Sequence, residues 1–499
     1  MDIYRIDKED TVAVALNPLK AGEVYRIGNK TALAAAEDIP AGHKIALQDM
    51  KKGETIYKYG ASIGKASEDI KRGQWVHLHN VISCADSEKE FQYAFDPDKV
   101  VMPGTSDRTF RGYQRKSGEV GTRNYIAILS GVFCANSHIK KIAAMASEQM
   151  KKTEHFDGFL PLTHECGCGQ AGDDLVNVRK VLAGLLQNPN FGGILFLEVG
   201  CEITKLDTIL PYLEKDLDPE RFRCITMQEV ENEEETAMEA LEELYQRVNL
   251  DRREDCSIAG LHIATNCGGS DGFSGLTGNR LVGKMAERIC GMGGTVTLTE
   301  ITEMFGAEQI LMNRAIDRAT FEKIKDLMHR HKAYIEKYGQ SANGNPSFGN
   351  KQGGITTIED KSLGCVQKSG KNAIVDVVFY GERVKEKGLN LVQGPGSDLV
   401  GVTSQIVAGA NLVVFSTGRG TPVAFAVPTI KVATNHRIFE KKRSWMDFNA
   451  GCLIDGTDIE SMTEAFTTLV LKTASGEYES SNERAGFYEI GILRDGVIL

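Results

Sequence analysis

The sequence predicts an α/β protein in which a small amino-terminal β domain precedes a two-part α/β body. Residues 1–88 alternate short apolar stretches with glycine turns and contain no long run with a 3.6-residue period, which is typical of compact β structure. From Tyr113 onward, strand-like apolar runs alternate with helical patterns, as in a parallel sheet covered by helices. The chain has 499 residues, too many for a single core, and its 41% of apolar residues can fill several.

This pattern divides the chain into four segments: a β domain over 1–88, a linker over 89–106, an α/β domain over 107–252 and a second α/β domain over 253–499. The linker is polar, contains proline and glycine and has no clear period. Four helical patterns in the body cover residues 139–151, 173–186, 231–250 and 320–338. Residues 339–351 then form a long irregular segment. Its Gly, Asn and Lys content suits contacts to an oxyanion, and the alternative is a surface loop over a helix end.

Composition and charge argue against several classes of partner. The net charge is −10 with a pI near 5.6, and no Lys/Arg run is interleaved with aromatic residues, so we expect neither nucleic acid nor a membrane surface as a partner. The amino terminus has no apolar signal core and no apolar stretch approaches 18 residues, so we expect a soluble, cytoplasmic protein. Its eleven cysteines are then expected to be reduced. The sequence does not determine the oligomeric state, and a homo-oligomer stays open.

Cysteines next to glycine turns recur where strand-like runs end. Cys267 opens a turn that also holds Ser270 and Asp271, directly after an apolar run over 257–264. The same setting surrounds three further thiols, Cys134, Cys168 and Cys201. Cys365 lies in a glycine turn ahead of another apolar run. Because ligands collect at the carboxyl ends of parallel strands, these thiols can converge into a dispersed metal or iron–sulfur site, although each one taken singly can also be a small core residue.

Two other motifs suggest polar chemistry. His77 and His79 follow a strand-like run, and a strand period of two puts both imidazoles on one face. Such a pair can bind a metal or act in acid–base catalysis, but two half-exposed strand histidines are equally ordinary. Arg419 lies between Gly418 and Gly420 after an apolar run, where its planar guanidinium can grip a carboxylate at two points; a solvated surface turn is the alternative. No Walker-type motif is present, which disfavours nucleotide chemistry.

Taken together, these motifs resemble the altronate/galactarate dehydratases of bacterial sugar-acid catabolism. The stretches that carry the resemblance follow one another along nearly the whole chain: Gly42-His43-Lys44, Gly121-Thr122-Arg123-Asn124, Gly200-Cys201-Glu202, Cys267-Gly268-Gly269-Ser270-Asp271, Asn345-Pro346-Ser347, Gly349-Asn350-Lys351, Asp360-Lys361-Ser362-Leu363-Gly364-Cys365 and Thr417-Gly418-Arg419-Gly420-Thr421-Pro422. The resemblance implies an amino-terminal SAF-type β-clip domain before a two-part dehydratase body. Residues 77–80 and Cys365 look more like the altronate branch, whereas residues 164–170 and 423–425 depart from its pattern.

The family resemblance implies an iron-dependent hydro-lyase that converts D-altronate to 2-keto-3-deoxy-D-gluconate in hexuronate catabolism. The reaction removes the C2 proton and the C3 hydroxyl, and a Lewis-acidic metal assists both; Fe2+ suits thiolate and imidazole ligands, with Mn2+ as a substitute. We expect the metal ligands, mononuclear or in a cluster, among Cys134, Cys168, Cys201 and Cys267. The catalytic groups are expected among His43, His77, His79 and Lys361. Substrate contacts are expected from Arg123, Asn124, Ser270, Asp271, Asn350, Lys351, Gly418, Arg419 and Gly420.

Other functions stay open beside this hypothesis. The substrate can be another aldonate or an aldarate such as galactarate, and a sulfolactate-type lyase would release sulfite in place of water. A non-catalytic sugar-acid-binding protein is the alternative from another class. The intact thiol turns and Gly-Arg-Gly turn favour the enzyme.

Overall fold

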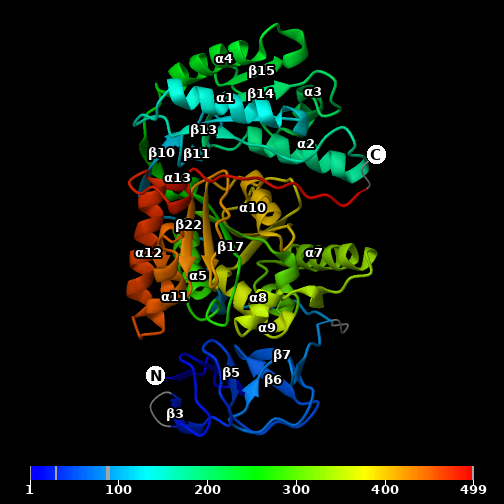
Figure 1. Ribbon diagram of the computed structural model, residues 1–499, viewed down its shortest axis with the longest axis vertical. Helices are drawn as coiled ribbons and strands as arrows, with labels where there is room; N and C mark the ends of the chain where they lie inside the picture. Colours follow the sequence, from blue (N-terminus) through cyan, green and yellow to red (C-terminus); the bar gives the residue numbers. More distant parts are fainter. Residues whose placement is uncertain (1, 28–30, 86–89, 497–499) are drawn as a thin grey trace.

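The computed structural model describes residues 2–27, 31–85 and 90–496, and it stacks three units along the long axis of the molecule (Figure 1). The amino-terminal β domain lies at one end, the carboxy-terminal α/β unit in the middle and the other α/β unit at the far end. The predicted fold class, a β domain followed by a two-part α/β body, is confirmed. The predicted boundary between residues 88 and 89 lies outside the described residues.

The β domain contains a six-stranded sheet, β4-β3-β1-β2-β5-β8, and a three-stranded sheet, β6-β7-β9. Its strands are β1 (Ile3–Tyr4), β2 (Val12–Ala15), β3 (Val24–Ile27), β4 (Thr31–Ala34), β5 (Lys44–Ala46), β6 (Thr55–Lys58), β7 (Ala61–Ala66), β8 (Trp75–Val76) and β9 (Val81–Ile82). Four similar turns precede short strands, and each has a glycine in the left-handed region: Gly22 (φ 81°), Gly42 (82°), Gly53 (87°) and Gly73 (91°). Only glycine adopts this conformation without strain, so these turns fix the course of the domain.

The second unit is built on a parallel four-stranded sheet, β13-β12-β14-β15. Its elements are β12 (Tyr125–Ser130), α1 (Asn136–Gln149), β13 (Gly158–Pro161), α2 (Gly172–Leu186), β14 (Phe191–Glu198), α3 (Leu206–Ile209), β15 (Phe222–Thr226) and α4 (Glu233–Val248). β14 is buried along its whole length because α1 and α4 cover one face of the sheet and α2 covers the other. The three helices predicted here are confirmed, with bounds within three residues of those expected.

The carboxy-terminal unit holds a parallel seven-stranded sheet, β19-β20-β18-β17-β21-β22-β23. Its strands are β17 (His262–Cys267), β18 (Thr295–Leu298), β19 (Ile374–Val378), β20 (Gly388–Val392), β21 (Leu412–Thr417), β22 (Thr429–Ala433) and β23 (Phe448–Asn449). Its helices are α5 (Gly278–Gly291), α6 (Glu308–Met312), α7 (Arg318–Lys337), α8 (Phe348–Gln352), α9 (Ile358–Cys365), α10 (Asp398–Val407), α11 (His436–Lys441), α12 (Ile459–Ala474) and α13 (Ser481–Ala485). α5 and α12 cover one face of the sheet and α10 the other. α7 confirms the predicted fourth helix.

The two α/β units share a buried junction. α2 packs against α10 so closely that a Cβ on Gly184 would lie 2.4 Å from the Val407 side chain. Buried amides add polar contacts: Asn188 Nδ2 donates to Ala410 O at 2.9 Å and Asn190 Nδ2 to the carbonyl of residue 411 at 2.8 Å. A small antiparallel sheet of β10 (Thr109–Gln114), β11 (Val120–Gly121) and β16 (Glu254–Ser257) lies beside this junction.

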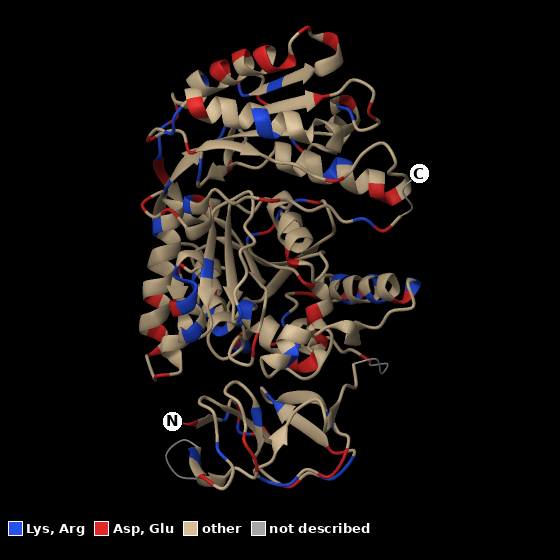
Figure 2. Ribbon diagram, viewed as in Figure 1, with Lys and Arg blue, Asp and Glu red and all other residues tan. Residues whose placement is uncertain are grey.

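Charged residues of both signs are spread over the three units, and acidic residues recur along α4 (Figure 2). All eleven cysteines are free of disulfide bonds. Within the described ranges, no helix is long and apolar enough to cross a membrane.

Candidate active site at the carboxyl edge of the seven-stranded sheet

The candidate site lies where the strand order of the seven-stranded sheet reverses. The chain leaves β17 through α5 on one face and enters β21 through α10 on the opposite face. β17 and β21 are neighbours, so the loops after them diverge and form the crevice in which α/β proteins bind ligands. The loop after β17 carries Cys267 to Asp271 and the loop after β21 carries Arg419. These two predicted motifs meet, since the Arg419 N–H donates to Gly269 O at 2.9 Å.

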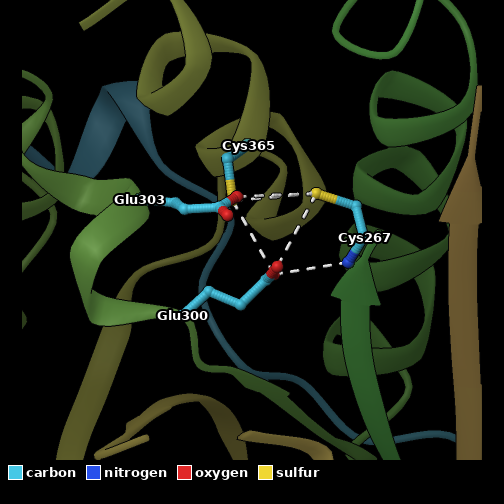
Figure 3. Close-up of side chains that lie close together, drawn as sticks. All are labelled: Cys267, Glu300, Glu303 and Cys365. Atoms are coloured by element: carbon cyan, nitrogen blue, oxygen red, sulfur yellow. Dashed lines mark hydrogen bonds between the residues drawn. The ribbon is translucent and has the colours of Figure 1, made fainter. Parts of the chain in front are cut away.

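Four buried side chains point toward one another at this edge (Figure 3). Cys267 ends β17, Glu300 and Glu303 follow β18, and Cys365 is the last residue of α9. The Cys267 Sγ lies 3.9 Å from Cys365 Sγ, 3.9 Å from Glu300 Oε1 and 4.0 Å from Glu303 Oε2. Glu300 has a φ of 68°, a left-handed conformation that residues other than glycine seldom adopt and that often marks functional sites.

A buried lysine joins three of these groups. Lys368 Nζ donates to Cys267 Sγ and Cys365 Sγ, each at 2.9 Å, and to Glu300 Oε2 at 2.5 Å. The hydrogen bond from the Cys365 thiol and the Lys368 ammonium lower the pKa of Cys267. Burial and the neighbouring Cys267 thiolate raise the pKa of Glu300 far above its ordinary value. The cluster thus holds a thiolate beside a carboxyl group that favours its protonated form, an arrangement suited to proton transfer.

A second lysine holds the other glutamate. Lys361 Nζ lies 2.6 Å from Glu303 Oε1 and donates to Asn345 Oδ1 at 2.8 Å. Burial alone would raise the pKa of Glu303, but the ammonium groups of Lys361 and Lys368 outweigh it and lower that pKa. Burial alone would lower the pKa of Lys361, but Glu303 outweighs it and raises that pKa. Lys361 and Glu303 therefore form a charged pair at neutral pH.

Polar atoms without partners surround the cluster. Buried oxygens that lack a hydrogen-bond partner within the described chain include those of Asn266, Ser270, Thr299 and Ser362. Asn266 Nδ2 donates to Asp398 Oδ1 at 3.0 Å, and burial, together with Glu303 and Cys267, raises the pKa of Asp398 to about 7. Unpaired buried polar atoms are rare in folded proteins, so their concentration here marks a place where a polar ligand or an ion binds.

The donor set fits a metal cation. Ligand atoms of Cys267, Cys365, Glu300 and Glu303 lie within 4.8 Å of one another, and sulfur combined with carboxylate oxygen suits Fe2+. The Lys368 ammonium already contacts three of these four groups, so the cluster is built to stabilise positive charge. A metal ion bound by both sulfurs would share or replace these ammonium contacts.

A cavity of about 390 Å³ opens beside the same loops. Its lining includes three cationic side chains, Arg419, Arg437 and Lys441. Arg419 is exposed and donates to Gln352 Oε1 at 3.2 Å. Residues 345–352 connect the cavity with the cluster, because Gln352 lines the cavity and Asn345 Nδ2 donates to Glu303 Oε1 at 3.2 Å. Two larger cavities, of about 540 and 490 Å³, are lined by residues of the second unit and its border, and neither includes a member of the cluster.

The β domain closes this edge through a buried ion triad. Asp360, on α9, lies 2.8 Å from Lys44 Nζ and 2.9 Å from Lys58 Nζ, and no side chain of the three is more than 2% exposed. Lys44 also donates to Gly354 O at 2.7 Å. Burial alone would raise the pKa of Asp360, but the two ammonium groups outweigh it and hold that pKa well below its usual range. Figure 1 accordingly places the β domain directly against α8 and α9.

His43 and His77 lie on the same interface around Trp75. Trp75 Nε1 donates to His43 Nδ1 at 3.2 Å, so this network assigns the proton of His43 to Nε2, which lies 3.2 Å from Gln352 O. Burial and Lys44 lower the pKa of His43 to about 4 and that of His77 to about 3, so both rings are neutral near pH 7. His77 Nδ1 is buried without a partner among the described residues. His43 thus docks the domain, and His77 offers a nitrogen that can accept a proton.

Three family models match the chain in sequence order. The altronate/galactarate dehydratase SAF domain matches residues 1–84, the second domain of D-galactarate dehydratase/altronate hydrolase matches residues 112–249, and the C-terminal domain of D-galactarate/altronate dehydratase matches residues 258–498. The chain belongs to the altronate/galactarate dehydratase family. The predicted resemblance is therefore confirmed.

Individual members of the altronate/galactarate dehydratase family are similar over their full length. The altronate dehydratase of Escherichia coli (strain K12) is 41% identical over 501 residues, covering 100% of both chains. The altronate dehydratase of Bacillus subtilis (strain 168) is 40% identical over 499 residues, covering 99% of both. The galactarate dehydratase (L-threo-forming) of E. coli (strain K12) is 31% identical over 500 residues, covering 97% of this chain and 95% of its own.

In this family member, the four thiols predicted as metal ligands do not form one site. Cys267 is buried in the seven-stranded unit, whereas the other three, Cys134, Cys168 and Cys201, are exposed in the second unit. Carboxyl ends of strands converge only within one sheet, and these thiols follow strands of two different sheets. Cys267 is joined instead by Cys365, which ends a helix and does not lie in the predicted turn.

Arg123 and Asn124, which were predicted to contact substrate, lie away from the candidate site. Both precede β12, at the amino edge of its sheet, and both are at most 3% exposed. Arg123 donates from Nε to Glu483 Oε1 at 2.6 Å and from Nη1 to Thr473 O at 2.7 Å, and Asn124 Nδ2 donates to His155 O at 2.7 Å. The two Arg123 bonds join the second unit to α12 and α13, and the Asn124 bond lies within the second unit.

The prediction that His77 and His79 share a strand face is also wrong. β8 ends at Val76, and residues 77–80 form a turn in which the Asn80 N–H donates to His77 O at 3.1 Å. Asn80 Oδ1 in turn accepts from the His77 N–H at 2.9 Å, the turn chemistry typical of asparagine. The two imidazoles instead flank Trp75, at ring distances of 5.1 and 5.6 Å, and His79 is exposed.

Asp271 positions loops at the site. Its carboxylate accepts from Thr434 Oγ1 at 3.1 Å, Asn435 Nδ2 at 2.8 Å and the Phe273 N–H at 3.1 Å. Gly418 must lack a side chain, because a Cβ there would lie 2.2 Å from Asp271 Cγ. Asp271 and Gly418 therefore lock the loops after β17, β21 and β22 together. Both also line the cavity beside Arg419, so the predicted substrate contact stays a prediction.

The remaining predicted residues lie around the site in different roles. Asn350 caps α8 with Ser347 and donates to Ser270 O at 2.8 Å, so it fixes the loop that presents the unpaired Ser270 hydroxyl. Lys351 is half-buried in α8. Gly420, at φ 88°, shapes the turn behind Arg419 and donates to Thr417 Oγ1 at 2.9 Å.

Sequence reasoning missed Glu300, Glu303, Lys368 and Asp398. Both glutamates follow the apolar run over 295–298, so the strand-end rule that identified Cys267 could have found them. Lys368 lies three residues after Cys365, in a 3-10 turn that follows α9, and Asp398 begins α10. Nothing in their local sequence distinguishes these two from surface residues.

Proposed function

We propose that this chain dehydrates D-altronate to 2-keto-3-deoxy-D-gluconate and water, as a cytoplasmic enzyme of hexuronate catabolism. The observation that carries the proposal is a segment, residues 345–352, that lines a cation-lined cavity through Gln352 and bonds to a buried cluster of thiols, carboxylates and lysines through Asn345. The higher identity to altronate dehydratases than to a galactarate dehydratase supports altronate as the substrate. Eleven free cysteines support a reducing compartment.

The protein side chains supply binding and proton transfer. Arg419 grips the substrate carboxylate at two points, with Arg437 and Lys441 adding positive charge, so that C2 and C3 face the cluster. Lys361, held protonated by Glu303, donates the proton that leaves with the C3 hydroxyl as water. The unpaired Nδ1 of His77 accepts the C2 proton. The docked β domain excludes bulk water from this edge.

We infer that Cys267, Cys365, Glu300 and Glu303 hold Fe2+, with Mn2+ as a substitute. When bound, the ion supplies Lewis acidity for the negative charge that develops beside the substrate carboxylate. With the ion bound and all four ligands deprotonated, Lys361 and Lys368 would offset part of their negative charge.

The test is an anaerobic assay of the purified chain with ferrous iron, in which D-altronate, galactarate and sulfolactate are supplied separately. We expect a 2-keto-3-deoxy acid from altronate, with kcat/KM at least ~10-fold above that for galactarate, equivalent to about 1.4 kcal/mol. Preference for galactarate, or sulfite release from sulfolactate as the main reaction, would overturn the substrate. Tight altronate binding without any keto acid would indicate a binding protein.

A further inference from the structure

Three free thiols follow adjacent strands at the carboxyl edge of the four-stranded sheet. Cys134 follows β12, Cys168 follows β13 and Cys201 follows β14, and β12 is the middle strand of these three. Ser130 of β12 pairs with Leu197 of β14. Cys134 lies four residues after Ser130, and Cys201 lies four residues after Leu197. In the register with β13, Cys168 lies one residue further along than Cys134. Neighbouring strands are about 5 Å apart, so the three loops leave the sheet side by side.

Close backbone contacts fix these three loops. The Phe133 N–H donates to Cys166 O at 2.8 Å, and a Cβ on Gly167 would lie 2.6 Å from the Phe133 ring. A Cβ on Gly131 would lie 1.8 Å from Thr204 O, so the loops after β12 and β14 touch through their backbones. The thiols are therefore presented by one packed surface and not by three independent loops.

The three thiols do not all lie within 4.8 Å of one another, which argues against a single metal ion. A single metal ion needs ligand atoms a few ångströms apart, and the two groups of described residues with ligand atoms within 4.8 Å do not include these thiols. An iron–sulfur cluster holds its thiolates further apart, because each binds a different iron atom. We propose that Cys134, Cys168 and Cys201 hold a [4Fe–4S] cluster. Its fourth iron has no cysteine ligand and is open to a small oxygen ligand such as a carboxylate or hydroxide.

The surroundings of the thiols suit a cluster. Two exposed apolar side chains of the same loops, Phe133 and Ile203, flank the thiols and would limit the access of water. Arg179, on α2, donates to Ile203 O at 3.0 Å, and its buried Nε–H has no partner within the described residues. A guanidinium here offsets the negative charge of a thiolate-bound cluster. Gln228 Nε2 donates to Cys201 Sγ at 3.7 Å, the kind of hydrogen bond that tunes cluster potential.

The inference is independent of the altronate reaction, because these thiols lie in a different unit from Cys267 and Cys365. The full chain is reconstituted anaerobically with ferrous iron and sulfide, and acid-labile sulfide and visible charge-transfer absorption are measured. We expect about four sulfides per chain, the content of one cluster. Mononuclear iron at Cys267 contains no sulfide, so this readout separates the two sites.

Single serine replacements compare the three proposed cluster thiols with a control thiol of the same sheet. Cys134→Ser, Cys168→Ser and Cys201→Ser should each remove the absorption and most of the sulfide. Cys224→Ser, at an exposed free thiol in β15 of the same sheet, should keep both. Far-UV circular dichroism and thermal unfolding verify that all four variants fold. Iron uptake without sulfide, a disulfide between two of the three thiols in anaerobically purified protein, or parental sulfide in the Cys134→Ser, Cys168→Ser and Cys201→Ser variants would overturn the proposal.

Discussion

Replacing Asp360 by asparagine tests whether charge locks the β domain to the body. The substitution keeps the shape of the side chain but removes the carboxylate that lies 2.8 Å from Lys44 and 2.9 Å from Lys58, in a triad that is at most 2% exposed. A hydrogen bond to a charged group contributes ~1.5–3 kcal/mol, and removing one partner of a buried ion pair costs ~3–5 kcal/mol. Lys44 already has a pKa of about 8 and can release its proton, which limits the loss of stability when the carboxylate is removed. We expect Asp360→Asn to lower the free energy of unfolding by ~3–5 kcal/mol in total.

The assay is urea denaturation followed by tryptophan fluorescence. The chain has two tryptophans, so Trp445→Phe leaves Trp75, which stacks on His77 at the interface, as the reporter. Asp69→Asn is the control, because Asp69 pairs with Lys51 at 2.8 Å in the same domain with both side chains at least half exposed, and we expect no measurable change. If Asp360→Asn unfolds at the same urea concentration as Asp69→Asn, the triad does not stabilise the interface.

The same residue predicts a pH dependence. The folded pKa of Asp360 lies below its unfolded value, so its stabilising contribution is complete at neutral pH and is lost as the pH falls below the ordinary aspartate pKa of about 4. The parent should therefore lose interface stability in acid more steeply than Asp360→Asn. Parallel acid-unfolding curves would contradict this assignment.

Four further results are expected. Arg419→Lys should raise KM for altronate by about 10- to 100-fold at unchanged thermal stability, since an ammonium cannot make the two-point contact worth ~1.5–3 kcal/mol; unchanged KM and kcat would remove Arg419 from the site. Lys361→Met should lower kcat at least ~100-fold, and parental kcat would exclude it as the acid. Gly418→Ala should lower the free energy of unfolding by ~1–3 kcal/mol through its clash with Asp271, whereas parental stability would show that the loops can move apart. Chelation should abolish turnover and ferrous iron restore it; full activity in metal-free protein would contradict the metal assignment.

Local sequence patterns predicted most of the fold. Helix periodicity located α1, α2, α4 and α7, and the alternation of helices with apolar runs identified the parallel sheets. The pattern failed at His77, where an apolar alternation runs into a turn that Asn80 stabilises through a side-chain hydrogen bond. A single hydrogen bond of this kind leaves no trace in periodicity.

Only part of the site was predicted, because sequence patterns report local structure and not contacts between distant segments. The strand-end rule found Cys267 and Arg419 because each follows its own strand directly. It could not decide which thiols share a sheet, so it merged Cys267 with three cysteines of another unit. Lys368 and Asp360 act through tertiary contacts with residues about 100 and 300 positions away, and no local pattern encodes such contacts.

The most direct test of the proposed active site is anomalous diffraction at the iron edge from crystals of the full chain, reconstituted anaerobically and shown to turn over altronate. We expect an anomalous peak bounded by the sulfurs of Cys267 and Cys365 and the carboxylates of Glu300 and Glu303. Active crystals with no iron between these groups, and with the Lys368 ammonium still bonded to both sulfurs, would contradict it.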